Sequence, residues 1–345
     1  MIALALLLAT GAPAGGDDYS VDAPNPEGVW LHAAAGAGYV GRDGVVGIEA
    51  GIGLETQPFA AHLAVPLMLR VIDLPPAVDP AAPAACHVVR CEEWLDGGRI
   101  SAEALGRAVD EVRVLEPGDV FHLKAGRVFA TLGHGALVDE YTNSADWDRR
   151  HTGIYAESNL PWAKAQLQAI AGDFLAPQEL FGVRASASPL SSSSEDAPAL
   201  DRFLGRMRIG IESAGDLAAP ITPVDANGDV VPGSTAQPLV GAAADVTWPL
   251  LEDGSGFQLA PYASASTMYG LTASVGAAPS VGAGGALGVD GSVDIFVVAL
   301  RVGARAFADS PAHRSAVFDT LYDVDRRRYA LASGGFSAGG IATLP

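Results

Sequence analysis

The stretch Val120-Phe-His-Leu-Lys-Ala-Gly-Arg-Val-Phe129 decides the fold class, because its side chains alternate in character. His122, Lys124 and Gly126 fall on one face of an extended strand, and Phe121, Leu123, Ala125 and Phe129 fall on the other. Successive side chains of a β-strand point to opposite faces, so the stretch predicts a strand with one polar and one apolar face. A polar loop containing Leu132-Gly-His-Gly135 follows, and then a hairpin that turns at Leu160-Pro-Trp162.

The same alternation recurs along most of the chain. The predicted strands span residues 30–40, 45–54, 60–71, 120–129, 152–160, 164–174, 183–188, 202–213, 239–248, 257–268, 283–290, 292–307 and 328–343. A tight turn at Gly288–Gly291, which contains Asp290-Gly291, is expected between two of these strands. The pattern predicts an all-β fold, an antiparallel transmembrane β-barrel of roughly 12–16 strands with long extramembrane loops and one short helix.

Composition favours strands that face lipid over strands that face water. Charged residues make up only 18% of the chain and hydrophobic residues 49%, whereas a soluble domain carries about 25% charged residues. After the N-terminus the sequence contains no apolar run of about 18 residues, which excludes a bundle of transmembrane helices. A soluble sandwich would place many charges on its outward face, but here the non-apolar face is mostly Gly, Ala, Ser and Thr.

The chain divides into a short leader and one large domain. Residues 1–14 are an apolar run that ends in the cleavage pattern Ala12-Pro-Ala14, as in a secretory signal peptide. Residues 15–345 form the predicted barrel, with an extramembrane insertion at residues 73–118 that includes a short helix capped by Ser101. In an exported protein Cys86 and Cys91 are expected to form a disulfide. A zinc site that adds His87 is the alternative.

The charge balance excludes one class of partner. The net charge is −19, and no basic stripe with interleaved aromatic residues is present, so nucleic-acid binding is not expected. The acidic residues gather in the predicted loops. They are interpreted as solvated loop residues, with divalent-cation bridging to lipopolysaccharide as the alternative.

Two segments carry a resemblance to a known class of protein. The stretches Phe121-His-Leu-Lys-Ala-Gly-Arg-Val-Phe-Ala-Thr-Leu-Gly-His-Gly135 and Glu140-Tyr-Thr-Asn143 resemble uncharacterised outer-membrane proteins of deltaproteobacteria. With its signal-like start and alternating strands, the whole chain resembles Gram-negative outer-membrane β-barrel proteins of the porin-like kind. The resemblance implies a bacterial outer-membrane location and contact with lipid and lipopolysaccharide. It also implies folding by the barrel-assembly machinery, with a homo-oligomer as one form of assembly.

Charged residues on the polar faces are the candidate functional residues of the barrel. They are Arg184, Arg206, Arg208, Arg301, Arg305, Glu157, Glu212 and Asp245. Opposed basic and acidic strips across a pore would filter small polar solutes by charge. In the alternative interpretation these groups pair with one another and close the lumen, which makes the barrel a non-conducting structural or surface-binding protein.

The loop after residue 129 offers a second candidate site. His134 stands near Asp139 and Asp146, which could form a metal or substrate patch or could simply tuck the loop into the lumen. No serine is placed to pair with His134. The G-x-S-x-G motif at Gly335-Phe-Ser-Ala-Gly339 lacks the Asp and His that should follow it in an α/β-hydrolase. The sequence therefore predicts a protein that is not an enzyme, with no catalytic residues, no bound metal and no cofactor.

Overall fold

A single large β-sheet organises the protein. The computed structural model describes residues 28–40, 43–72, 89, 94–96, 99–100, 102–144, 151–190, 204–223, 235–250, 257–272, 279–295, 298–320, 322 and 331–333. These residues form a 14-stranded sheet and two small two-stranded sheets. The predicted all-β antiparallel architecture, with its range of strand numbers, is confirmed.

Thirteen strands follow one another across the large sheet, and each pairs antiparallel with its neighbours. In order they are β1 (Gly28–Val40), β2 (Asp43–Thr56), β3 (Phe59–Ile72), β6 (Val109–Val114), β7 (Phe121–Gly126), β10 (Gly153–Leu160), β11 (Ala165–Ala171), β12 (Phe181–Ala187), β13 (Arg208–Pro223), β14 (Thr235–Thr247), β15 (Phe257–Thr272), β16 (Pro279–Ile295) and β17 (Val298–Asp309). The short strand β18 (Leu331–Ser333) pairs with β13 in parallel.

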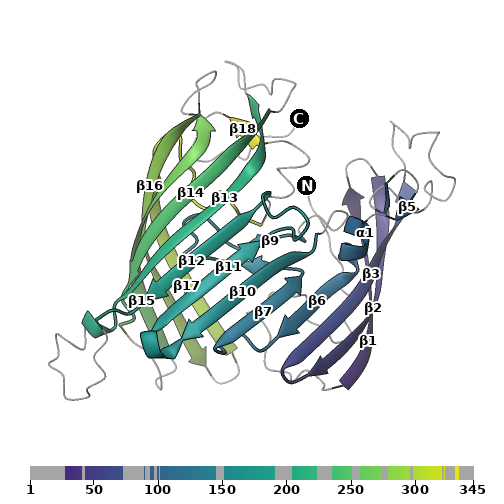
Figure 1. Cartoon of the computed structure of the whole chain (residues 1–345), viewed down its shortest axis with the longest axis horizontal. Helices are drawn as coiled ribbons and strands as arrows, with labels where there is room; N and C mark the ends of the chain where they lie inside the picture. The colour runs from purple at the N-terminus through teal and green to yellow at the C-terminus, as the bar shows by residue number, and fades with distance from the viewer. Residues whose placement is uncertain are drawn as a thin grey trace.

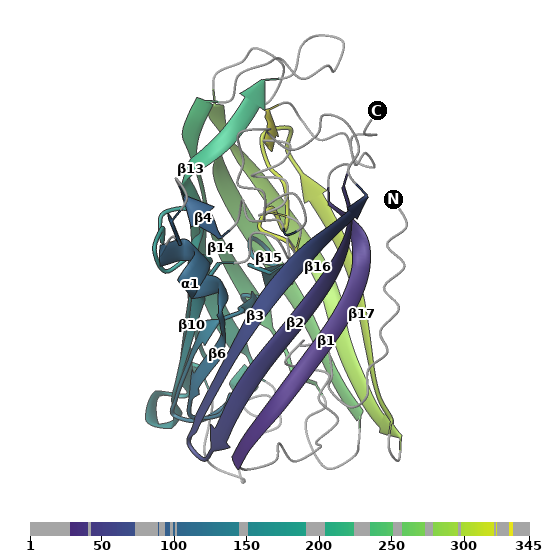
Figure 2. The ribbon, with the colours of Figure 1, turned by 90° about the vertical axis from the view of Figure 1, so that its right-hand side faces the viewer.

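The sheet is strongly curved across its width, so that it has a convex and a concave face (Figure 1). Seen from the side, the long strands are tilted together around one axis (Figure 2). In the part of the chain that is described, β1 and β17 are the two ends of the pairing order, and no backbone ladder joins them. The architecture is therefore a sheet curled in the manner of a barrel.

The convex face is apolar and exposed. In β2 and β3, Ile52 and Leu63 are exposed, whereas the alternate positions Glu49, Glu55 and Ala64 are buried. The exposed large apolar residues with this outward parity include Ile48, Ile52, Leu54, Leu63, Val65, Leu67, Val71, Leu167, Val183, Ile209, Ile211, Val281 and Leu287. A surface that faces water rarely exposes so many large apolar residues on one face of a sheet. The alternation predicted from the sequence for these strands is confirmed.

Several predicted boundaries differ from the structure. The hairpin at Leu160-Pro-Trp162 is present, and the chain turns there through the 3-10 segment Pro161–Ala163. No turn occurs at Asp290-Gly291, because β16 continues through both residues with β15 and β17 paired on either side. The predicted insertion at 73–118 contains β6, which pairs with β3 and β7 in the large sheet. The predicted loop at 214–238 contains the second half of β13.

The described helical structure is short. The α-helix α1 (Ala102–Arg107) has six residues and leads into β6. Among the described residues no helix is long and apolar enough to cross a membrane.

Two segments leave the sheet and lie against its concave face. We call them the plug, which consists of residues 127–144 and of residues 310–320 with Tyr322. The first includes the small hairpin of β8 (Phe129–Ala130) and β9 (Tyr141–Thr142), which lies inside the curl of the sheet (Figure 1). The two segments bond to each other, since Phe318 N donates to Leu137 O and Ala316 N donates to Ala136 O, both at 3.0 Å.

The plug and the concave wall share a buried apolar core. Its members are Val128, Ala130, Leu132, Leu137, Val138, Tyr141, Ile170, Leu180, Ala214, Ala219, Leu239, Ala243, Met268, Leu271, Val317, Phe318 and Tyr322. Glycines in the wall allow side chains of the plug to approach the sheet closely. A Cβ at Gly182 would lie 2.8 Å from Leu132 Cδ1, and a Cβ at Gly241 would lie 2.8 Å from Leu137 Cδ2. Small inward residues therefore provide the space that the plug fills.

The substitution Leu132→Ala tests whether the plug is a packed part of the folded protein. We expect it to lower the free energy of unfolding by about 2–5 kcal/mol, because it leaves a cavity against Gly182. Leu175→Ala is the control, since Leu175 is exposed and its loss should change stability by no more than about 0.5 kcal/mol. Urea unfolding of the protein in detergent micelles measures both values. Equal effects of the two substitutions would show that the plug is not packed against the wall.

Candidate functional site

The concave face carries a row of nine residues in direct cross-strand register, seven of which are polar. The row runs through His122, Glu157, Gln168, Arg184, Glu212, Ala243, Ser266, Gly284 and Asp309, from β7 to β17. Directly opposed side chains in antiparallel strands have Cβ atoms only about 4.5–5.5 Å apart. The register therefore brings residues from nine strands into one line across the interior.

Arg184 and Asp245 form a buried ion pair within this face. Arg184 donates from both terminal nitrogens to the two oxygens of Asp245, with 3.0 Å between Nη2 and Oδ1. Gly210, which pairs with Asp245 across the strands, has no side chain, and the guanidinium occupies that space. The pair lies under the plug, because a Cβ at Gly133 would also collide with the guanidinium. Two of the predicted residues thus neutralise each other.

The other predicted acidic residues are also held by hydrogen bonds. Glu212 accepts a bond of 3.3 Å from Val138 N in the plug. Glu157 accepts from Tyr155 Oη and Asn159 Nδ2, both at 2.9 Å. Both carboxyl groups are buried on the concave face. Their oxygens are used to fix the plug and the wall.

His134 fixes the tip of the first plug segment to the wall. Its ring stacks on Tyr262 with the centroids 3.8 Å apart and the planes at 4°. Its Nδ1 lies 3.0 Å from Asp290 Oδ2, and its Nε2 lies 2.6 Å from Thr247 Oγ1. Burial lowers the pKa of the His134 imidazole, an effect larger than the opposing attraction of Asp245 and Asp290. His134 is therefore neutral near pH 7.

Arg305 holds the same loop from β17. Its Nη1 donates to His134 O at 2.9 Å, and its Nη2 donates to Asp139 Oδ2 at 2.7 Å. Two residues that the sequence placed in a loop site, His134 and Asp139, are thus brought together with a predicted wall arginine. The arrangement matches the interpretation of a loop tucked into the interior.

The remaining predicted residues lie elsewhere. Arg206 is exposed before β13 and donates to Leu250 O at 2.6 Å, and Arg208 is exposed at the first position of β13. Arg301 lies on β17 opposite Ser292, and only its backbone is among the described parts of the structure. Asp146, Cys86 and Cys91 lie outside the described residues. The structure does not bring Arg206 or Arg208 into contact with Arg184.

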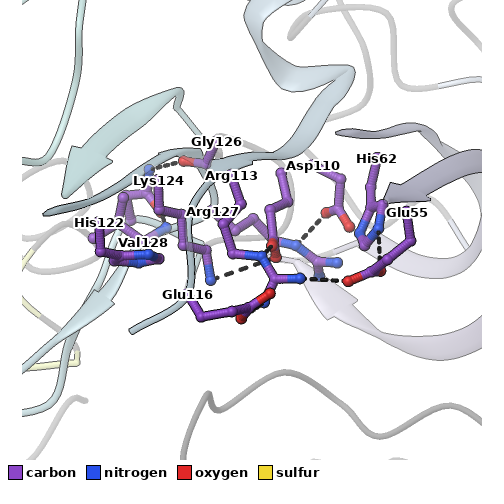
Figure 3. Close-up of polar contacts among 12 residues, drawn as sticks. Glu55, His62, Asp110, Arg113, Glu116, His122, Lys124, Gly126, Arg127 and Val128 are labelled. Atoms are coloured by element: carbon purple, nitrogen blue, oxygen red, sulfur yellow. Dashed lines mark hydrogen bonds and ion pairs between the residues drawn. The ribbon is translucent and has the colours of Figure 1, made fainter. Parts of the chain in front are cut away.

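A second polar group occupies the wall formed by β2, β3, β6 and β7. We call it the β6 charge cluster, and it contains Glu55, His62, Asp110, Glu111, Arg113, Glu116, Lys124 and Arg127 (Figure 3). Arg113 reaches Glu55 and also donates to Glu116 at 2.7 Å, while Arg127 pairs with Asp110. The sequence does not reveal this cluster, because β6 lies within the range predicted as an insertion. The alternation Asp110–Arg113 is too short to identify a strand alone.

The second plug segment is anchored by residues that the sequence analysis also missed. His313 Nδ1 lies 2.8 Å from Asp309 Oδ1, and His313 Nε2 lies 2.9 Å from Ser266 Oγ. Tyr322 Oη donates to Asp216 Oδ2 at 2.8 Å, and both residues are buried. The only feature of the sequence that points to this anchor is His313, four residues after Asp309, and this spacing is common by chance.

Comparison with known proteins gives two structural likenesses. No model of a protein family matches the chain, and no curated protein matches it. The structure is similar to a loop L8 deletion mutant of OmpT, an outer membrane protein of Vibrio cholerae, with 10% identity, a TM-score of 0.36, and coverage of 82% of this chain and 85% of that chain. It is also similar to OpdK of Pseudomonas aeruginosa, solved with vanillate, with 10% identity, a TM-score of 0.32, and coverage of 82% and 66%.

Removing one partner of the buried ion pair should be costly. We expect Arg184→Ala to lower the free energy of unfolding by about 3–5 kcal/mol, because it leaves Asp245 buried without its partner. The double variant Arg184→Met with Asp245→Leu should recover most of that loss, since it removes both charges. Arg206→Ala is the exposed control. If the double variant is as unstable as Arg184→Ala, the cost does not come from the unpaired charge.

Proposed function

We propose that the chain is an outer-membrane β-barrel protein that passes small polar solutes along its concave interior, as porins do. The observation that supports this most is the opposite polarity of the two faces of one continuous sheet. Large apolar residues are exposed on the convex face, and ion pairs and hydrogen-bonded carboxylates occupy the concave face. A sheet with this distribution fits lipid on the outside and water within.

The convex face provides a surface for lipid chains. Phe121, Leu167, Val183 and Ile211 come from four strands and line one apolar groove there, and all four are exposed. An acyl chain that packs in this groove would cover apolar area that otherwise contacts water. The apolar leader predicted for residues 1–14 is consistent with export.

The plug narrows the interior and determines which charges a solute meets. Arg184 and Asp245 are covered, so they are unsuited to act as the filter that the sequence suggested. Arg127 and Glu116 of the β6 charge cluster retain more exposed side chains, and so does Arg305. We infer that these exposed charges, in place of Arg184, act on a passing solute.

A second candidate function has a specific observation in its favour. The plug is joined to the wall by an apolar core as well as by polar bonds, which suits a permanently closed, non-conducting barrel. The two functions differ in whether the plug can move aside. Planar-bilayer recordings of the purified protein distinguish them, because an open path gives stable conductance steps.

Weakening the hold of Arg305 on the loop should favour the open state. Its ion pair with Asp139 is partly exposed, and such a pair contributes up to about 1 kcal/mol. Arg305→Ala is therefore expected to raise the ratio of open to closed dwell times by up to about fivefold. Arg208→Ala is the control, because Arg208 lies exposed at the start of β13.

The same bilayer recordings can also contradict the channel proposal. If neither the wild-type protein nor Arg305→Ala shows conductance steps, although both are folded by circular dichroism, the channel proposal is wrong and the non-conducting barrel is favoured. If both conduct with equal dwell times, the channel stands and Arg305 is not part of its gate.

A further inference from the structure

Ser266, His313 and Asp309 form a hydrogen-bonded relay on the concave face. Ser266 Oγ lies 2.9 Å from His313 Nε2, and His313 Nδ1 lies 2.8 Å from Asp309 Oδ1. Ser266 lies on β15, Asp309 lies on β17, and His313 lies in the plug segment that follows β17. A hydroxyl bonded to an imidazole that is itself oriented by a carboxylate is the arrangement that activates a serine nucleophile.

The register of three strands builds this relay. Ser266 on β15 opposes Gly284 on β16, which in turn opposes Asp309 on β17. Because Gly284 has no side chain, the imidazole of His313 can lie over it and bridge its two neighbours. A Cβ at Gly284 would lie 2.5 Å from both His313 Cε1 and Nδ1. The glycine is therefore a requirement of the geometry.

The carboxylate is held firmly in its orienting position. Ser315 donates to Asp309 twice, from its backbone N at 2.9 Å and from its Oγ at 2.8 Å. Ser310 Oγ accepts a bond of 2.9 Å from Ala283 N and so fixes the turn to β16. An ionised Asp309 accepts a hydrogen bond from His313 Nδ1–H, which leaves Nε2 without a proton and able to accept a hydrogen bond from the Ser266 hydroxyl. This is the tautomer that a general base needs.

Ser266 lies at the edge of the area that the plug covers. Two residues further along β15, Met268 is only 1% exposed beneath the plug. On the other side the neighbouring row holds Ser264, Ala286 and Phe307, of which Ser264 and Ala286 are half-buried and Phe307 is 62% exposed. Ser266 is only 6% exposed, so an ester that reaches its hydroxyl must come from this row. Its short side chains and the phenyl ring suit a short acyl group.

We propose that Ser266 is a nucleophile activated by His313, and that it hydrolyses short-chain carboxylic esters inside the barrel. The bond from Oγ to the acyl carbon forms as the hydroxyl proton moves to His313 Nε2. The ester C–O bond then breaks, and the alcohol leaves with that proton. Water then forms a bond to the acyl carbon as one of its protons moves to Nε2. The bond between Oγ and the acyl carbon breaks, the carboxylic acid leaves, and the proton on Nε2 returns to Oγ. Asp309 is a positioning residue in both halves of the reaction.

Covalent labelling tests the proposal directly. The full chain in detergent micelles is treated with diisopropyl fluorophosphate, and the modified residue is located by mass spectrometry. We expect one adduct, on Ser266, together with hydrolysis of p-nitrophenyl acetate. His313→Gln should lower the labelling rate by roughly 10²-fold or more, which is the contribution typical of a general base. Ser186→Ala is the matched control, because Ser186 faces inward on β12 and is, like Ser266, 6% exposed.

A purely structural anchor would give a different set of results. Asp309→Asn should abolish labelling and Asp309→Glu should restore part of it, whereas an anchor would change only the unfolding midpoint. Folded wild-type protein without an adduct on Ser266 overturns the proposal, and this measurement needs no variant to fold. An adduct that forms equally fast in His313→Gln overturns it too. Bilayer conductance is recorded separately, so the channel proposal stands or falls independently.

Discussion

The constraint on which the structure depends is the alternation of side chains across one curved sheet. Each strand must present apolar residues to the outside and polar or small residues to the inside along the length that faces the plug. A slip of one residue in any strand would exchange the two sets. In β2, for example, it would turn Glu49 and Glu55 outward and Ile52 inward. The long ladders between β13 and β17 oppose such a slip over most of the concave wall, although β13–β14 and β15–β16 each contain one register shift near the end of the ladder.

The small residues of the inner wall have a second consequence. Gly182, Gly241 and Gly284 each lie where a side chain of the plug touches the sheet. Glycine in a strand costs stability, and it is often found where another part of the chain approaches closely. Here the loss is offset by apolar contacts of Leu132 and Leu137 and by the bonds of His313. The glycines thus link the composition of the chain to the filling of its interior.

Much of the fold could be predicted from the sequence, because period-two alternation depends on each strand alone. It gave the correct faces of β2, β3 and β7, and the hairpin between β10 and β11. It failed at Asp290-Gly291, which has the composition of a turn although both residues lie within β16. Asp290 there is bonded to His134, a contact 156 residues away in sequence. No local pattern contains that information.

The candidate site was predictable only as far as the parity of each residue. Parity correctly turns Arg184, Glu212 and Asp245 inward, but it does not reveal their partners. Those partners depend on the register between neighbouring strands. The register in turn depends on the lengths of the turns, which are difficult to predict from the sequence. The β6 charge cluster is hidden for a related reason, since β6 has only six residues and lies within the range predicted as an insertion. Likewise Ser266 and His313 meet only because β15, β16 and β17 align around Gly284.

The electrostatics of the interior follow from the same register. Beneath the plug, Arg184 is paired with Asp245, because an unpaired buried charge would be costly. The acidic groups of Glu212 and Asp216 accept hydrogen bonds from the plug instead. Charged residues at the margin of the plug, such as Arg305 and Asp139, are partly exposed. Their ion pairs therefore contribute less to the stability of the plug on the wall. The plug is thus fixed firmly at its centre by apolar packing and buried hydrogen bonds, and more weakly at its edge. Any movement that opens the interior should begin at that edge, where Arg305, His134 and the row beside Ser266 lie.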